Sequence, residues 1–120
     1  MYYFFDTYAL YEIISGNKIY EKYKELPIIL SVLNVAELYW NLLKEKDKKA
    51  ANEQIEKLDF EILDIDYKLI IDAVLFRHEN KRHDVSLPDV VGYLLAKKHK
   101  LKFLTGDKFF ENKDNVEFVK

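Results

Sequence analysis

The sequence of 120 residues contains no cysteine. This absence excludes a disulfide framework, a zinc–thiolate site and a thiol nucleophile. No apolar run approaches the roughly 20 residues of a membrane span. The first residues also lack the basic segment of a signal peptide and meet an acid at Asp6. We therefore expect a cytoplasmic protein without membrane association.

An excess of positive charge is missing as well, because 19 Lys and Arg residues are outnumbered by 21 Asp and Glu residues, giving a formal net charge of −2. Any nucleic-acid contact must then come from local basic patches and not from the field of the whole molecule. The chain is 49% hydrophobic and 33% charged, which is a foldable balance. Its length suits one domain, spanning residues 1–120, with a single core.

Apolar runs and helical spacing alternate along the chain. Five runs have the pattern of strands, the last at a sheet edge: residues 2–5, 28–31, 60–65, 102–105 and 116–119. The intervals show helical spacing, with Asn17, Asn34 and Asp66 as expected N-caps. Strands joined through helices imply right-handed crossovers and a parallel sheet. The sequence therefore predicts a three-layer α/β/α fold with a mainly parallel sheet of about five strands.

Acidic residues stand where the predicted strands end. Asp6 follows the first strand directly, Asp107 follows the fourth after one glycine, and Glu37 is expected in the first turn of the helix after the second strand. The carboxyl ends of parallel strands meet at one sheet edge, where sites form. Asp89 opens the helix that leads into the fourth strand, and it reaches this edge only if the preceding loop returns there.

Each acid also has a purely structural interpretation. Asp6 and Asp107 stand at helix N-cap positions, and Glu37 and Asp89 stand three residues after candidate caps, which is capping-box spacing. Convergence of the four is a different matter, because each pair of nearby carboxylates costs about 1 to 4 kcal/mol at effective dielectric constants of about 80 to 20. A divalent cation offsets this repulsion. Oxygen ligands without cysteine or histidine at zinc-like spacing favour Mg²⁺ or Mn²⁺.

Several segments together resemble the PIN domain family, most closely the VapC-type ribonuclease toxins of prokaryotic toxin–antitoxin pairs. They are FFDTYAL, NVAEL, SLPDVVGYLLAKKHKLKFLTGDKFF and the closing hydrophobic strand, and they cover essentially the whole chain. The family has an Asp after the first strand, a Glu in the helix after the second, an Asp opening the late helix and a T-x-D turn. The matching positions are Asp6, Glu37, Asp89, Asp107 and, at the start of the turn, Thr105.

The resemblance implies a Mg²⁺- or Mn²⁺-dependent endoribonuclease, in which water activated by the cation hydrolyses a phosphodiester of single-stranded or loop RNA. Asp6 and Asp89 would be the principal metal ligands, Glu37 and Asp107 would complete the acidic pocket, and Thr105 would support it. The resemblance also implies a homodimer and a small antitoxin protein as partner.

Two clusters of basic residues flank the late helix. The first contains the candidate RNA contacts Arg77, Lys81, Arg82 and His83, because its loop leads toward Asp89. The second, at residues 97–102, is expected at the opposite edge of the sheet. A run of charges is more often only a solvated face. Six tyrosines in the first 23 residues have a similar choice between core packing and a partner surface.

Two other functions remain compatible with the sequence. One is a PIN-like protein-binding scaffold whose acids are structural. The other is a PIN nuclease of ribosomal RNA processing without an antitoxin. A phosphoacceptor receiver domain has the same fold class, but it requires paired acids after the first strand. Asp6 is alone there, and Thr105 and Gly106 stand where its lysine would be.

Overall fold

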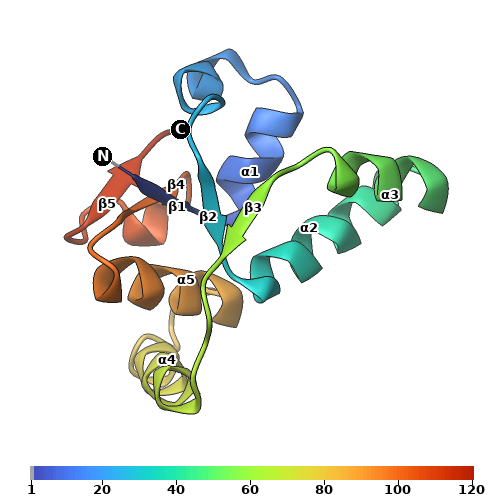
Figure 1. The fold of residues 1–120 in the computed structure, drawn as a ribbon. Helices are drawn as coiled ribbons and strands as arrows, with labels where there is room; N and C mark the ends of the chain where they lie inside the picture. Colours follow the sequence, from blue (N-terminus) through green and yellow to red (C-terminus); the bar gives the residue numbers. More distant parts are fainter. Residues whose placement is uncertain (1) are drawn as a thin grey trace.

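A computed structural model describes residues 2–120 and places a parallel sheet between layers of helices (Figure 1). Its strand order is β3-β2-β1-β4-β5, and every neighbouring pair is parallel. The strands are β1 (Tyr3–Phe5), β2 (Ile28–Leu30), β3 (Phe60–Ile62), β4 (Lys102–Thr105) and β5 (Val116–Phe118). All five apolar runs are therefore strands, β5 lies at an edge, and the predicted α/β fold class is confirmed.

In the described part of the chain, five α-helices and two short 3₁₀ segments connect the strands. They are α1 (Thr7–Ile14), η1 (Lys18–Tyr23), α2 (Val32–Glu45), α3 (Lys48–Glu56), α4 (Tyr67–Glu79), α5 (Leu87–Lys98) and η2 (Lys108–Phe110). The expected caps Asn17 and Asp66 are confirmed, because each side chain accepts a hydrogen bond from a backbone N–H of the segment it precedes. Within residues 2–120, no helix combines the length and the apolar character that a bilayer crossing needs.

Helix α2 begins earlier than the sequence predicts. Its N-cap is Ser31, and the expected cap Asn34 is a buried residue of the first turn. The Asn34 Oδ1 atom accepts hydrogen bonds from Ser31 N at 3.0 Å and Ser31 Oγ at 2.8 Å, and its Nδ2 donates to Thr7 Oγ1 at 3.2 Å. The predicted cap at Asn34 is wrong because these buried bonds already use the amide. Glu37 consequently lies in the second turn of α2 and not in the first.

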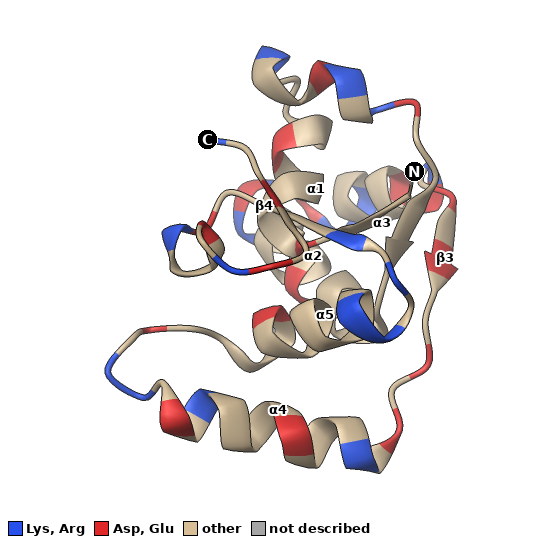
Figure 2. Ribbon diagram, turned by 90° about the vertical axis from the view of Figure 1, so that its left-hand side faces the viewer, with Lys and Arg blue, Asp and Glu red and all other residues tan. Residues whose placement is uncertain are grey.

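Helix α5 packs directly on β1 and β4 and fixes the centre of the fold. Gly92 permits this close approach, because a Cβ atom at this position would lie 2.7 Å from Phe4 Cε1 and 3.1 Å from Phe103 Cε1. Helix α4 packs against α5 on the side away from the sheet and forms an outer layer (Figure 2). The helices thus cover both faces of the sheet as predicted, and α4 adds a layer that the prediction did not include.

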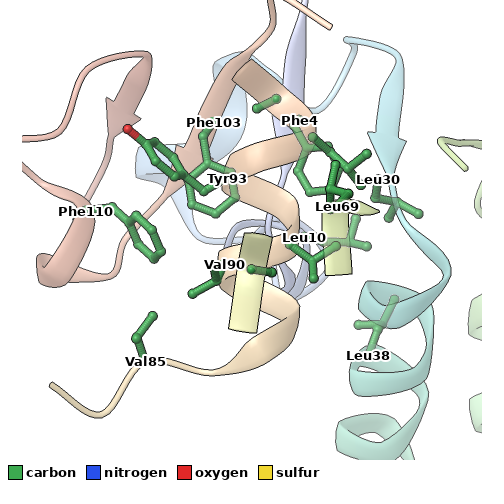
Figure 3. Close-up of a cluster of buried hydrophobic side chains, with 14 of the residues drawn as sticks. Phe4, Leu10, Leu30, Leu38, Leu69, Val85, Val90, Tyr93, Phe103 and Phe110 are labelled. Carbon is green, nitrogen blue, oxygen red and sulfur yellow. The ribbon is translucent and has the colours of Figure 1, made fainter. Parts of the chain in front are cut away.

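Aromatic side chains fill the space between the sheet and α5. Phe4 of β1 and Phe103 of β4 point toward α5, where they meet Tyr93 and Phe110 (Figure 3). The ring centroids of Phe103 and Phe110 lie 5.0 Å apart, and those of Tyr93 and Phe103 lie 5.8 Å apart in an edge-on arrangement. This cluster holds α5, and therefore its first turn, against the two central strands.

The opposite face of the sheet is covered by α1 and η1. Phe5 and Leu104 alternate to this side and pack with Tyr20 and Tyr23. The Tyr20 hydroxyl donates to the carbonyl oxygen of Val119, and the Tyr23 hydroxyl donates to a carboxylate oxygen of the last strand at 2.6 Å. These two tyrosines therefore belong to the core, with their hydroxyls anchoring the end of the chain.

Candidate active site

The strand order reverses between β1 and β4, because the chain continues from β1 to β2 on one side and reaches β4 on the other. Such a switch point is where open α/β sheets form their sites. Asp6 follows β1, and its N–H donates to the carbonyl of Leu104 at 3.2 Å. Asp107 follows β4 after Gly106, where a Cβ atom would meet the Val119 carbonyl oxygen at 2.9 Å. A Cβ atom there would also lie 2.3 Å from Tyr8 Cε1, so the close packing around this turn depends on glycine.

Asp6 is buried, with 1% of its surface exposed. Its Oδ1 atom accepts a hydrogen bond from Ala9 N at 2.7 Å, which confirms the expected helix cap. Its Oδ2 atom is also buried, and it is the one such side-chain atom within residues 2–120 that has no hydrogen-bond partner. The cap role therefore accounts for one oxygen of this carboxylate, and the other oxygen is available to a ligand such as a cation.

Asp89 reaches the same edge of the sheet, which the sequence had left open. Ser86 caps α5 by accepting a hydrogen bond from Asp89 N at 3.2 Å. Burial raises the pKa of Asp89 to about 7, and the neighbouring Glu37 and Asp107 carboxylates act in the same direction. Asp89 also raises the pKa of Asp6, so its carboxylate interacts electrostatically with those of all three other acids.

The charge of the cluster is visible in Asp6 too. Burial raises the pKa of Asp6 well above its ordinary value, and the carboxylates of Asp89 and Asp107 raise it further. The Thr105 side chain and the Ala9 N–H oppose this shift without cancelling it. Like charges held together in a poorly solvated place are a frequent property of functional sites.

Glu37 is oriented by a chain of hydrogen bonds that continues into the buried interior. The Thr7 hydroxyl donates to Glu37 Oε1 at 2.7 Å, and the same hydroxyl accepts from Asn34 Nδ2 at 3.2 Å. Asn34 is in turn fixed by Ser31. The sequence interpretation missed the roles of Thr7 and Asn34. The available signal was a polar residue directly after Asp6, at a helix start that apolar residues otherwise surround.

Asp107 and Thr105 form the turn after β4. Asp107 N donates to Thr105 Oγ1 at 3.0 Å, and Asp107 Oδ1 accepts from Phe109 N at 3.0 Å. The expected cap at Asp107 is thus confirmed. Thr105 is fully buried and supports both this turn and the neighbouring Asp6. All four predicted acids and Thr105 therefore lie at one edge of the sheet.

The donor chemistry of this edge suits a hard divalent cation. Carboxylate oxygens are the ligands of Mg²⁺ and Mn²⁺, and the unpartnered Oδ2 of Asp6 supplies one of them. Among residues 2–120, however, no three acidic or histidine side chains already stand as a finished metal-binding group. Carboxylates without a counter-charge repel one another. The residues fit the cation in kind, and they are electrostatic neighbours rather than a preformed coordination sphere.

The two basic clusters lie at opposite ends of α5 (Figure 2). Arg77, Lys81, Arg82 and His83 border a hollow of about 450 Å³ at the loop before α5, on the side where Asp89 begins the helix. The second cluster, at residues 97–102, follows the other end of α5 and precedes β4. This is the arrangement that the sequence predicted.

Comparison with protein families decides the relationship of this chain. A family model of the PIN domain matches residues 3–116. The chain belongs to the PIN domain family. The resemblance that the sequence motifs indicated is therefore confirmed over nearly the whole length. No curated protein matches the sequence significantly.

Solved structures with the same PIN fold include chains of toxin–antitoxin assemblies. A toxin–antitoxin complex from Klebsiella pneumoniae matches with a TM-score of 0.74 and 23% identity, covering 98% of this chain and 96% of its own. VapBC2 from Rickettsia felis, bound to a DNA fragment from their promoter, matches with a TM-score of 0.74 and 21% identity over 100% of both chains. PAE2754 from Pyrobaculum aerophilum matches with a TM-score of 0.68 and 19% identity, covering 98% and 90%. At these identities the likeness shows the fold.

Proposed function

We propose that this PIN domain is a Mg²⁺- or Mn²⁺-dependent endoribonuclease that hydrolyses RNA phosphodiesters. One observation carries the proposal: at the switch point of the sheet, Asp89 shares its surroundings with three other carboxylates, and the buried Oδ2 of Asp6 has no partner within residues 2–120. Structural caps do not require such convergence. A divalent cation bound at this place would account for the convergence of the carboxylates.

Asp6 and Asp89 are the residues that would hold the cation, since Asp6 is buried, Asp89 is partly buried, and neither meets a basic partner in the described part of the chain. A divalent cation would activate water and offset the charge that develops on phosphate oxygens. Thr7 presents Oε1 of Glu37 to the same place, and Thr105 fixes the turn that carries Asp107.

The proposal includes the role of toxin in a type II toxin–antitoxin pair, with a small antitoxin and a second copy of the chain as partners. Its support is the shared fold with chains of toxin–antitoxin complexes. Large apolar side chains also remain exposed on two helices: Val32 and Trp40 on α2, and Ile71, Val74 and Leu75 on α4. Trp40, with 65% of its surface exposed, is thus a surface residue. A dimeric mass of the isolated protein in light scattering would support the second copy, and a monomeric mass would remove it.

Cleavage of RNA with and without the metal is the direct test. With Mn²⁺ or Mg²⁺ we expect fragments of a single-stranded RNA, and EDTA should abolish them. Asp6→Asn should be inactive, because it removes the negative charge that would bind the cation. It should still fold, because the asparagine Oδ1 atom can accept the same hydrogen bond from Ala9 N at the start of α1. If the folded Asp6→Asn protein cuts RNA at the rate of the parent, the acids are structural and the protein is better described as a PIN-like scaffold.

A further inference from the structure

The loop between α4 and α5 encloses a basic hollow of about 450 Å³ with the end of α4. Three cationic side chains line it, Arg77, Lys81 and Arg82, and one acid, Asp84, offsets part of their charge. The net charge of the lining is therefore positive, although the whole chain carries −2. Figure 2 shows the blue segment of this loop standing away from the helices, at the side of α5 where the helix begins.

One cation of the basic hollow is anchored to the wall, and none of the three forms an ion pair within residues 2–120. Arg77 Nε donates to the Val85 carbonyl oxygen at 2.9 Å, which anchors the guanidinium at the wall. Its terminal nitrogens make no hydrogen bond to residues 2–120, and neither Lys81 nor Arg82 forms an ion pair there. Guanidinium and ammonium groups with free donors are the usual partners of phosphate oxygens.

The basic hollow adjoins the carboxylate site through two segments. Val85 lines the hollow, and the next residue, Ser86, caps the helix that carries Asp89. His83 packs on Phe109, with ring centroids 5.2 Å apart, and the N–H of Phe109 donates to Asp107. The segments that carry two of the four acids therefore also position the wall of the hollow.

We infer that the basic hollow binds backbone phosphates of the RNA strand whose scissile phosphate lies at the carboxylates. The inference rests on the proposed ribonuclease function for its ligand. A polyanion that approaches four clustered acids is repelled, and a cation at the acids relieves this repulsion only locally. Neighbouring phosphates need their own positive partners, and the basic hollow supplies them next to the site. The strand accordingly leaves the site over the α4–α5 loop.

The test compares two double substitutions with the same change of charge. Lys81→Gln with Arg82→Gln removes two cations of the hollow. Lys48→Gln with Lys49→Gln removes two exposed cations at the start of α3 and is the control. Arg77 is left intact because it holds the loop. Both pairs are made in the Asp6→Asn background, which prevents cleavage, and binding of a fluorescent single-stranded RNA is measured by anisotropy with Mn²⁺ at several salt concentrations.

We expect the hollow pair to weaken RNA binding about tenfold at low salt and the control pair to change it little. The slope of log K against log salt should become shallower by about 1.4 for the hollow pair, because each phosphate contact on a single strand contributes about 0.7. A single-stranded DNA of the same sequence should lose affinity equally, since phosphates are recognised. Equal affinities and slopes for the two pairs would overturn the inference and leave the basic hollow to an acidic protein partner.

Failure of this inference and failure of the proposed function give different results. If the parent protein does not cleave RNA with Mn²⁺ but the hollow pair alone loses RNA binding, the nuclease proposal is wrong and the basic hollow is still a nucleic-acid site. If the parent cleaves RNA and the two pairs bind alike, the reverse holds. Thermal melts should show both double variants folding like the Asp6→Asn protein.

Discussion

The acids at the two ends of helix α5 have opposite surroundings. At its C-terminal end, Lys97 Nζ lies 3.4 Å from Asp114 Oδ2, and Lys98 Nζ lies 3.3 Å from Asp66 Oδ2. Hydrogen bonds and these lysines lower the pKa of both acids. At the N-terminal end, Asp89 has no lysine beside it within residues 2–120, and burial together with the Glu37 and Asp107 carboxylates raises its pKa to about 7, although a hydrogen bond from Ser86 opposes the shift.

This difference separates two uses of a carboxylate. Where an acid is structural, the chain surrounds it with donors and places a lysine beside it, so that its charge costs little. Lysines are abundant enough for the same treatment elsewhere. Leaving Asp6 and Asp89 without one raises the free energy of the folded chain, and a bound cation would remove that cost. The unpaired end of α5 is therefore the end to examine for function.

Removing one carboxylate charge from each end of α5 tests this difference most directly. Asp89→Asn should reduce RNA cleavage by at least about 10³-fold, or about 4 kcal/mol in the activation free energy, because a principal ligand of the cation is lost. Asp114→Asn should leave cleavage unchanged, since its side chain still accepts the hydrogen bond of the Tyr93 hydroxyl. Initial rates with Mn²⁺ measure both. Similar rates for the two variants would mean that the two ends do not differ in function.

A smaller effect is expected from the hydrogen bond that orients Glu37. Thr7→Val keeps the shape of the side chain and removes the donor to Glu37 Oε1. We expect a loss of about 10- to 100-fold in cleavage, which is typical of groups that position ligands, together with a higher Mn²⁺ requirement. Thr7→Ser should restore most of the activity. If Thr7→Ser is as impaired as Thr7→Val, the methyl group matters and not the hydrogen bond.

The smallest effect is expected in the pH dependence of stability of the metal-free protein, because the pKa values of the acids at the two ends of α5 are shifted in opposite directions. The ordinary pKa of Asp89 is 3.8, so between about pH 4 and 7 the folded state binds more protons than the unfolded state, and stability falls as pH rises. Each such carboxyl contributes at most about 1.4 kcal/mol per pH unit. The lowered pKa values of Asp66 and Asp114 act in the other direction: their stabilisation is present above about pH 4 and is lost on acidification.

Urea unfolding between pH 4 and 8 in EDTA measures this balance. Asp89→Asn should flatten the fall of stability above pH 4, while Asp114→Asn should leave that part of the curve as it is. Mn²⁺ should stabilise the parent at pH 7 more than it stabilises Asp89→Asn, because binding to the folded state alone raises stability. Identical pH curves for the parent and Asp89→Asn would show that Asp89 is not destabilised by its neighbours.

The sequence was informative wherever position along the chain decides position in space. An acid that directly follows a buried parallel strand must lie at the carboxyl edge, so Asp6 and Asp107 were placed correctly. Asp89 was different, because it precedes its strand by a whole helix. Its position depends on how the loop before α5 turns, and the aromatic packing of α5 on β1 and β4 fixes that.

The errors came from residues whose hydrogen bonds reach distant parts of the chain. Asn34 has the local pattern of a cap, but its amide is used by Thr7 from another helix and by Ser31. Likewise, the stacking of α4 on α5 follows from the apolar face that α5 presents away from the sheet. Local patterns contain neither fact. The unpartnered oxygen of Asp6 is also a property of the folded surroundings alone.

The packing of Gly92 in the core fixes the position of the acid at the start of α5. It lies three residues, or nearly one helical turn, after Asp89, and the Phe4 ring occupies the space that a methyl group at Gly92 would need. A rigid helix cannot yield there without carrying its first turn outward. The position of Asp89 relative to Asp6 thus depends on the close contact between Gly92 and Phe4. Neither side chain could bind a metal or donate a proton, yet the two residues together determine how closely the first turn of α5 approaches the sheet.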